Sequence, residues 1–504
     1  MKKNWWLWVG LVIAVTLVRV ATTHRVFSQT FDEPYHLIAA YDVLTKRDYG
    51  ADPQHPPMRA IFALPFVHEP DPQGDVVTRG NTLLLRNDRY TQNIARARLG
   101  NLLFVAIGVL TAAVWGRRVL GPAGGLAAAI AYASVPSILA HGGVATTDMA
   151  GAATLPLALL ALDVLLERTT WRNTLLLGAA MGFALLSKFS FLMFFPAGAL
   201  VLFVARRRFP VVQLLVATLV CAFLAWAAYG FTFGTMQSVD GRAREMANEV
   251  LQAPWIADIP VPAPRMFTGV LEVKRHDVRG HTAFLLGETS EKGWWYYFPV
   301  ALLYKTPIAF LLLALLGARR AFVPLLIALA ILGAAMTSHI NIGVRHVLPL
   351  YAPLAICVAA AVLHWRRWIV VPLMAWLVVG VALAHPDYLP WFNALAGNQP
   401  ERVLNDSNLD WGQDVLRLVR HARKEKIPHI TTSLLGTTPL DRIGLPPRSE
   451  LQALQPAHGY VAISEGHIAL GRAMSPEIGK WLDDLFGNRP YRRIGKTIRL
   501  YQLP

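Results

Sequence analysis

The sequence has 504 residues, of which 54% are hydrophobic and only 16% are charged. A soluble globular protein carries about 25% charged residues, so this balance excludes an ordinary soluble domain and indicates a polytopic membrane protein. The net charge of +16 does not predict a nucleic-acid partner, because the arginines cluster at the ends of apolar runs, as in cytoplasmic loops. These clusters are Arg117-Arg118, Arg206 to Arg208, Arg319-Arg320 and Arg366-Arg367.

The first apolar run extends from about Trp5 to Thr22 and follows Met1-Lys2-Lys3. At roughly 18 residues it is long enough to span a bilayer and longer than the core of a signal peptide. We therefore expect an uncleaved first helix with its N-terminus in the cytoplasm. The two cysteines, Cys221 and Cys357, lie within other apolar runs, so neither a disulfide scaffold nor a cysteine zinc site is expected.

Further apolar runs divide residues 1–385 into about 11 predicted transmembrane helices of ~20 residues each. With the N-terminus inside, every basic cluster falls in a cytoplasmic loop and the C-terminus lies outside. The long loops 23–93 and 231–295 then face the outer side. The predicted helices start near Trp5, Ile94, Ala123, Met149, Leu175, Phe189, Val211, Tyr296, Ala321, Val347 and Trp368.

Residues 386–504 are too polar to cross a membrane and predict a small extracytoplasmic α/β domain. The residue patterns indicate helices at 414–424 and 480–486, and strands at 430–435, 459–463 and 496–503. The expected fold is therefore a polytopic α-helical membrane protein, N-in and C-out, with an α/β domain on its outer side.

The stretch Thr-Phe-Asp-Glu-Pro-Tyr-His, residues 30–36, lies just beyond the first predicted helix. Asp32 and Glu33 are adjacent acids beside a membrane, where low-dielectric surroundings disfavour charge. One interpretation is structural, because Thr30 and Glu33 fit a capping box and the apolar face that follows fits a helix lying on the membrane. The other is a catalytic pair, because further polar residues return to the same side of the membrane.

Lys188 follows an apolar run, residues 174–187, that rises roughly 21 Å as a helix and falls short of a ~30 Å hydrocarbon core. The lysine would then lie in the outer half of the membrane, facing a cavity or an anionic group. Snorkelling of the side chain to the interface is the structural alternative.

Three more outer turns carry polar side chains: His55-Pro56-Pro57, the turn that ends at Asp148, and residues 341–346. Taken singly, Asp148 fits a helix N-terminus, and Arg345 with His346 fits an interface anchor. Together they fit group transfer from a lipid-linked phosphate, in which a carboxylate base activates a hydroxyl and fixed cations stabilise the leaving phosphate. We expect the carboxylates of Asp32, Glu33 and Asp148 to be catalytic, with Asp32 as the base, and the phosphate to be bound by Arg345, His346, His55 and Lys188.

Candidates for substrate binding lie mainly in and after the loop 231–295. Trp294 and Trp295 can stack on a sugar, although an aromatic belt at the interface is the commoner arrangement. Lys305 lies within the next predicted helix and needs a partner there. The full set is Tyr35, His281, Trp294, Trp295 and Lys305. No Walker-type glycine loop occurs, and the histidines lack the spacing of zinc ligands, so no metal site is predicted.

Three motifs carry a resemblance to a known family: Asp32-Glu33-Pro34-Tyr35, Pro56-Pro57 after a polar residue, and Asp148 at an outer turn. Over most of residues 1–415 the chain resembles the GT-C superfamily of membrane glycosyltransferases, on the protein mannosyltransferase-like branch that includes the bacterial aminoarabinose transferases. The resemblance implies a polyprenyl-phosphate-linked sugar donor and a site on the outer face. It implies Asp32 as base, Glu33 beside the acceptor and Asp148 as a second acid.

The same resemblance places Arg345 where relatives have a phosphate-binding arginine, and His55 where relatives often have a lysine. Neutral histidine is a poorer anion partner, so the replacement makes the phosphate role of His55 weaker. Residues 293–299, 341–346 and 406–413 resemble a bacterial subgroup. The last of these, Asp-Ser-Asn-Leu-Asp-Trp-Gly-Gln, has no assigned chemical role, and the capped start of a helix is its structural interpretation.

The function predicted from these patterns is an inverting glycosyltransferase of the cytoplasmic membrane, with its active site facing the periplasm or exterior. It would move a sugar from a polyprenyl-phosphate-linked donor to a hydroxyl acceptor on a protein, lipid or glycan, with no firmly implied cofactor and with metal dependence open. The alternative is a membrane transporter or lipid flippase with an outer sensing domain. A transporter favours charges along the whole helical path and symmetry between halves, and neither is visible here.

Overall fold

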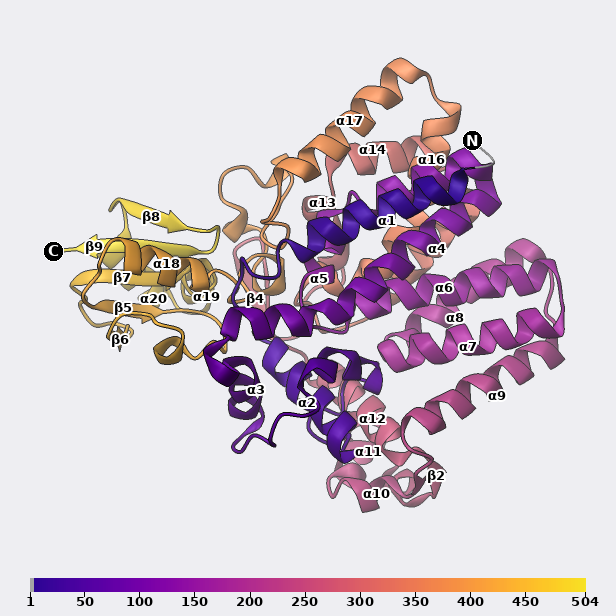
Figure 1. The fold of residues 1–504 in the computed structure, drawn as a ribbon, viewed down its shortest axis with the longest axis horizontal. Coiled ribbons are helices and arrows are strands. Elements are labelled where there is room, and N and C mark those ends of the chain that lie inside the picture. The colour runs from indigo at the N-terminus through magenta and orange to yellow at the C-terminus, as the bar shows by residue number, and fades with distance from the viewer. Residues whose placement is uncertain (1–3) are drawn as a thin grey trace.

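The computed structural model describes residues 4–504 and places helices side by side, with a β-sheet at one end of the molecule (Figure 1). All the predicted apolar segments are helical. The helices are α1 (Trp5–Ala21), α4 (Tyr90–Tyr132), α6 (Asp148–Glu167), α7 (Trp171–Ser187), α8 (Phe191–Arg206), α9 (Val211–Ala228), α13 (Tyr297–Lys305), α14 (Ile308–Gly317), α15 (Phe322–Ala335), α16 (Tyr351–His364) and α17 (Arg367–Leu383).

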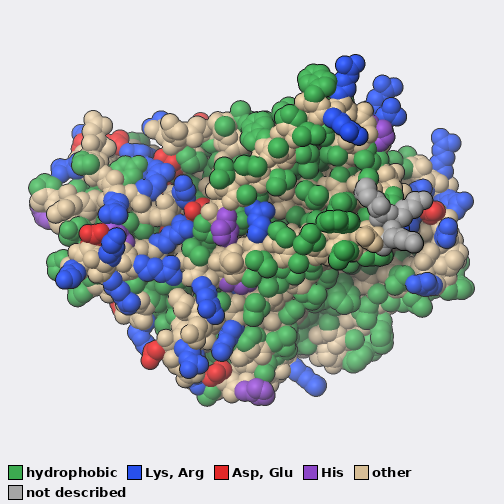
Figure 2. All heavy atoms as spheres, turned by 45° about the horizontal axis from the view of Figure 1, so that its top comes forward, with side chains coloured by type: hydrophobic (Ala, Val, Ile, Leu, Met, Phe, Trp, Pro, Cys, Tyr) green, Lys and Arg blue, Asp and Glu red, His purple; other side chains and the backbone are tan. Residues whose placement is uncertain are grey.

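Length and composition qualify 4 helices of the described chain as membrane spans, or up to 5 if one bent pair is counted. The spans are α4, α6, α9 and the run Val344–His364, which joins the short 3₁₀ helix η4 (Val344–Leu350) to α16. Figure 2 shows hydrophobic side chains over the middle of the helical part, with lysine and arginine toward the ends of the molecule. These features support a multi-pass membrane protein, whereas the number of about 11 crossings and the N-in orientation stay predictions.

The bent pair is α13 and α14, which the sequence predicts as one span. The two helices meet at 110°. Thr306 and Pro307 lie at the break, where proline cannot donate the hydrogen bond that would continue the helix. Helix α4 also folds back on itself, at Gly121, whose φ of +78° is in the left-handed region that favours glycine.

Helices α6 and α16 lie at the centre of the membrane part. The buried share of the apolar window is 83% for α6 and 78% for Val344–His364, against 17% for α9. Helix α9 therefore has most of its surface free for lipid, whereas the helices that lead to the outer turns at residues 148 and 345 are held on all sides. Rigid central helices are suitable supports for a site that needs fixed geometry.

The first outer loop folds as α2 (Glu33–Lys46), η1 (Pro57–Phe66) and α3 (Val76–Leu85). The apolar face that fits a helix lying on the membrane consists of Leu37, Ala40, Tyr41 and Leu44. The first three are buried against these elements, whereas Leu44 is 36% exposed. The second outer loop contains α10 (Met236–Val239), α11 (Ala243–Leu251), η3 (Pro254–Asp258), α12 (Pro264–Arg279) and two short hairpins, β1 (Phe233–Gly234) with β2 (Val261–Pro262) and β3 (Ala283–Leu285) with β4 (Glu288–Ser290).

The tail forms a five-stranded sheet in the order β6-β5-β7-β9-β8. Strands β6, β5 and β7 are parallel, while β9 is antiparallel to both of its neighbours. The predicted helices and strands are all present, and α19, β6 and β8 are additional. The elements are α18 (Val415–Lys424), β5 (Ile430–Ser433), β6 (Arg448–Glu450), β7 (Gly459–Ser464), α19 (Glu465–Met474), α20 (Pro476–Phe486), β8 (Tyr491–Ile494) and β9 (Ile498–Leu503).

Candidate active site

Arg345 lies between the two acids that the sequence predicted to meet. Its Nη1 donates to Asp32 Oδ2 at 2.7 Å and lies 3.8 Å from Asp148 Oδ2. Asp32 precedes α2, Asp148 begins α6 and Arg345 is in η4, so three distant segments converge on one nitrogen. The Asp32 side chain is 28% exposed, whereas that of Asp148 is 4% exposed. Asp32 is therefore the carboxylate that an incoming molecule can reach.

Asp148 is held by a second cation. Lys188 Nζ donates to Asp148 Oδ1 at 2.5 Å, from the end of α7. Thr146 Oγ1 donates to the other oxygen at 3.0 Å. The lysine that the sequence predicted to need an anionic group has thus found a carboxylate within the protein.

Glu33 follows Asp32 in the chain and, unlike it, is almost completely buried. Arg98 of α4 donates to both of its oxygens, through Nε at 2.8 Å and Nη2 at 2.7 Å, and the backbone N–H groups of Ala145 and Thr30 donate at 2.8 and 2.7 Å. Burial would raise the pKa of Glu33, but Arg98 and these donors hold the pKa below its usual range. Glu33 therefore stays ionised and joins the first loop, α4 and the turn before Asp148.

Residues 405–414, here called the strap, lie directly behind Arg345. The Trp411 ring lies under the guanidinium, with 4.4 Å from Arg345 Cζ to the ring centroid. Asn408 Oδ1 accepts from Val344 N at 2.9 Å, and Ser407 Oγ donates to Ile342 O at 2.7 Å. The strap thus fixes both the side chain of Arg345 and the backbone just before it.

The strap also holds the segment that carries Asp32. Phe31 N donates to Trp411 O at 2.9 Å, and Ser28 N donates to Gln413 O at 3.0 Å. Each contact joins residues nearly 400 positions apart, and both are backbone hydrogen bonds. The strap therefore lies between the acid and the cation of the site and sets their separation.

Lys305 holds the strap from the membrane side. Its Nζ donates to three backbone carbonyls, those of Leu389, Trp391 and Asn408, at 2.7, 2.6 and 2.6 Å. An ammonium has three donors, so no N–H of Lys305 is left for a substrate in this conformation. The partner that the sequence analysis expected for Lys305 is thus the backbone of residues 389–408.

Asp406 of the strap adds a third carboxyl to the site. Burial raises the pKa of Asp406, Arg345 lowers it, and the charge of Asp32 raises it further. Asp406 is thus close enough to feel both of the opposite charges. Because the sequence gave the stretch 406–413 only a capping role, this residue, Asn408 and Trp411 were missed, and so was Arg98.

Two of the predicted substrate-binding residues lie near Asp32. Burial and then the charge of Asp32 raise the pKa of Tyr35. Burial lowers the pKa of His281, with Arg345 acting in the same direction and Asp32 against it. His281 also pairs with His276 at 3.1 Å. The charge of Asp32 therefore acts on both rings, and that of Arg345 on His281.

The remaining predicted residues differ in their relation to the site. His346 is half-buried, and its Nε2 has no hydrogen-bond partner in the described chain. Trp294 is held through its backbone N–H, which donates to Asn341 Oδ1 at 2.7 Å. Trp295 is 68% exposed and contacts Tyr296 edge to face, as a residue of an interface belt would.

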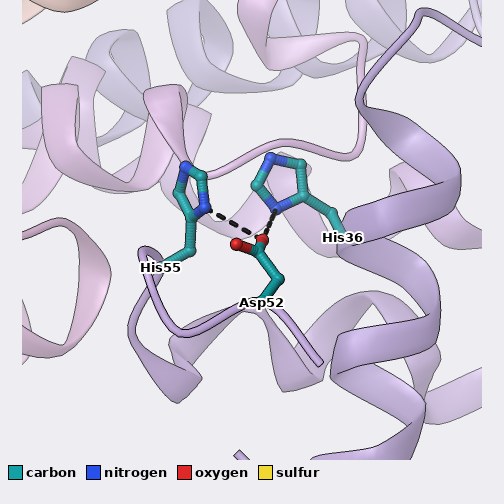
Figure 3. A group of neighbouring side chains, drawn as sticks. All are labelled: His36, Asp52 and His55. Atoms are coloured by element: carbon teal, nitrogen blue, oxygen red, sulfur yellow. Dashed lines mark hydrogen bonds and ion pairs between the residues drawn. The ribbon is translucent and has the colours of Figure 1, made fainter. Parts of the chain in front are cut away.

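His55 groups with two residues that the sequence did not connect. Its Nδ1 lies 3.0 Å from Asp52 Oδ2, and Nδ1 of His36 lies 3.9 Å from the same oxygen (Figure 3). One nitrogen or oxygen atom from each of the three residues lies within 4.8 Å of the others, a grouping that can hold a metal ion. The sequence spacing gave no sign of it, because His36 is on α2 and the other two follow in the next turn.

The site therefore presents an accessible carboxylate, a second carboxylate and two cations at the end of the helical bundle where α6 begins and α7 ends. A carboxylate can take a proton from a hydroxyl, and an arginine beside it can bind an oxyanion. The three parts predicted to meet, namely Asp32, Asp148 and Arg345 with Lys188, do meet. Glu33 and Lys305 support them from behind.

Comparisons with known proteins give a family match over part of the chain and a match of fold over nearly all of it. Residues 90–229 match the family model described as dolichyl-phosphate-mannose-protein mannosyltransferase. No curated protein matches the chain in a sequence comparison. The crystal structure of ArnT from Cupriavidus metallidurans bound to undecaprenyl phosphate is similar, with a TM-score of 0.53 and 14% sequence identity, over 98% of this chain and 98% of that chain.

The same enzyme in the apo state matches with a TM-score of 0.35 and 14% identity, over 98% of this chain and 97% of that chain. At 14% identity the likeness to the undecaprenyl-phosphate-bound ArnT concerns the fold. The family match covers α4 to α9, which carry Asp148 and Lys188. The resemblance predicted from the motifs is thus confirmed: this chain is similar to the GT-C membrane glycosyltransferases, mannosyltransferase-like in sequence over residues 90–229 and ArnT-like in fold.

Proposed function

We propose that this protein is an inverting glycosyltransferase that moves a sugar from a polyprenyl-phosphate-linked donor to a hydroxyl acceptor. The reaction takes place on the outer face of the cytoplasmic membrane. The observation that carries the proposal is the position of Arg345 Nη1, 2.7 Å from Asp32 and 3.8 Å from Asp148. The donor class agrees with the ligand of ArnT, undecaprenyl phosphate.

In this reaction the carboxylate of Asp32 accepts the proton of the acceptor hydroxyl as its oxygen attacks the anomeric carbon. The bond from that carbon to the lipid phosphate breaks, and the leaving phosphate carries away the electron pair. Arg345 and Lys188 bind the phosphate and stabilise the charge that develops on it. A single displacement of this kind inverts the configuration at the anomeric carbon.

The ion pair between Arg345 and Asp32 gives the order of events a physical basis. While Asp32 Oδ2 accepts a hydrogen bond from Arg345, that oxygen is not free to accept one from an acceptor hydroxyl. A donor phosphate competes for the same guanidinium and releases Asp32. Binding of the donor then prepares the base for the acceptor hydroxyl.

Residues behind the site have positioning roles in this mechanism. Glu33, with all of its oxygens occupied by Arg98 and backbone donors, fixes the turn before Asp148. Lys305 fixes the strap through three carbonyls. Tyr35 and His281 are the side chains that we propose to contact the acceptor or the sugar, and Trp294 and Trp295 stay candidates for stacking on the sugar.

The test replaces the base and the phosphate ligand separately. Glycans and glycolipids of cells with and without the protein are compared by mass spectrometry to identify the product, and donor binding is measured with purified protein and undecaprenyl phosphate. Asp32→Asn is expected to reduce product formation by at least about 100-fold while leaving lipid-phosphate binding nearly unchanged. Arg345→Ala is expected to weaken binding of the lipid phosphate as well.

The matched control is Asp71→Asn, an exposed acid of the same loop, 42% exposed, which should behave as wild type. Undiminished sugar transfer by the Asp32→Asn variant would rule out Asp32 as the catalytic base. Equal loss of donor and acceptor affinity in Arg345→Ala would contradict the phosphate role.

A further inference from the structure

The site around Arg345 contains no surplus of positive charge for a phosphate. Its two cations, Arg345 and Lys188, are already paired with Asp32 and Asp148. A phosphate that entered would have to share these cations with two carboxylates. A further source of positive charge close by would favour its binding.

His36, Asp52 and His55 form a cluster beside this site. His36 N donates to Asp32 O at 3.1 Å, so His36 lies one helical turn from the candidate base. His55 is 29% exposed and Asp52 15% exposed, whereas His36 is 2% exposed. The cluster is thus closed on one side and accessible on the other.

The geometry of the cluster is unsatisfied as it stands. Nδ1 of His36 is buried and has no hydrogen-bond partner in the described chain. Its nearest polar neighbour is Asp52 Oδ2 at 3.9 Å, which is too far for a hydrogen bond. Figure 3 shows the two imidazoles turning a nitrogen toward the same carboxylate. Buried nitrogens without partners are costly, and each one needs an explanation.

A cation between these atoms would satisfy all of them. Two ligands at about 2.0–2.1 Å from a tetrahedral ion are separated by ~3.4 Å. The separations from Asp52 Oδ2, 3.0 Å to His55 and 3.9 Å to His36, lie on either side of that value. Two imidazoles with one carboxylate are the ligand set of a zinc ion that keeps an open position.

Arg59 is the competing partner of Asp52. Its Nη1 contacts Asp52 Oδ2, and its Nη2 donates to the backbone carbonyl of Asp52. Because Arg59 is buried, it fixes the direction of the carboxylate and also neutralises its charge. Two of the three ligands are imidazole nitrogens, which favour zinc and its neighbours over magnesium or calcium.

We propose that His36, Asp52 and His55 form a binding site for a divalent transition-metal ion, with zinc as the favoured ion. The position left open by the three ligands faces the accessible side, where water or an anion can enter. If the proposed function holds, that anion is a phosphate oxygen of the donor, and the ion supplies the positive charge that the paired cations do not.

The test measures binding first and needs neither a sugar nor a lipid. Full-length protein, with any polyhistidine tag removed and metal stripped by chelation, is titrated with Zn²⁺ and with Co²⁺. We expect about one equivalent of tightly held Zn²⁺ and the visible spectrum of a four- or five-coordinate cobalt site with nitrogen ligands. His55→Ala and His36→Ala are expected to raise the Kd for Zn²⁺ at least about 100-fold. His68→Ala, an exposed histidine of the same loop, is the matched control and should bind as wild type.

Three results would overturn the site: no stoichiometric Zn²⁺ in the wild type, a cobalt spectrum of all-oxygen octahedral coordination, or affinity unchanged by His55→Ala. Because His55 is partly exposed, whereas His36 is buried, His55→Ala is the variant expected to fold normally. The cobalt spectrum is measured on the wild type and does not depend on any variant. Donor binding with and without Zn²⁺ is then compared. A site that binds zinc without changing donor affinity leaves the metal site standing and separates it from the glycosyltransferase proposal.

Discussion

Glu33→Gln separates a supporting role of Glu33 from a substrate-binding one. The substitution keeps the shape of the side chain but removes the charge opposite Arg98, whose side chain is only 1% exposed. Breaking a buried ion pair by removing one partner costs about 3–5 kcal/mol, because the other charge stays buried without compensation. The amide nitrogen of glutamine would also face a donor, since Arg98, Ala145 and Thr30 all donate to Glu33.

The assay is thermal unfolding of the purified protein in detergent, followed by intrinsic fluorescence. A loss of about 3 kcal/mol corresponds to roughly a 5 °C fall in apparent Tm in a chain of this size. The double variant Glu33→Gln with Arg98→Met should regain a large part of the loss, because replacing both partners of a buried pair is often nearly neutral. An unchanged Tm of Glu33→Gln together with lost activity would refute the supporting role and indicate that Glu33 contacts the substrate.

Two further predictions concern the strap. Trp411→Leu removes the ring under Arg345 and should weaken binding of undecaprenyl phosphate by about 3- to 30-fold, as a desolvated cation–π contact of ~1–2 kcal/mol implies; unchanged affinity would show that the ring does not position the guanidinium. Burial raises the pKa of Asp410 to about 7, so the folded state binds a proton that the unfolded state releases near pH 4. Stability from this group is therefore present at low pH and declines as pH rises from about 4 to 7, and Asp410→Asn should flatten the Tm profile over that window; a slope equal to that of the wild type would contradict it.

Much of the fold follows from local patterns. Hydrophobic length predicted the apolar helices, with α13 and α14 as one run, and residue patterns predicted β5, β7 and β9, the three central strands of the tail sheet. The bend of 110° between α13 and α14 could not be inferred from hydropathy, which treats Thr306 and Pro307 as two residues within one apolar run. Strand β6 is only 3 residues long, Arg448–Glu450, and too short to show a period.

The candidate site was predictable where residue type alone is informative. Acids and cations are expensive beside a membrane, so Asp32, Asp148, Lys188 and Arg345 were conspicuous before their positions in space were known. Trp411 and Asn408 were not conspicuous, because aromatic and amide side chains are ordinary in a polar tail. Their contacts with the site depend on the path of the chain, which brings the tail back to the first loop.

The cluster of His36 and Asp52 escaped for a related reason. Metal-binding motifs are recognised by short spacings between ligands on one element. Here His36 lies within α2, whereas Asp52 lies in the turn that follows this helix. Arg98 was missed because its sequence environment is that of an ordinary apolar helix. Its ion pair with Glu33 explains how the helix accommodates a buried arginine.

The strap has a consequence for how the protein is made. The last apolar helix, α17, ends at Leu383, and residues 405–414 follow it in the chain. The strap is therefore synthesised after every apolar helix, and Trp411 can reach Arg345 only once the tail has been made. A chain truncated after α17 would keep all of its apolar helices but lack the residues that hold Arg345 and the segment of Asp32 in place.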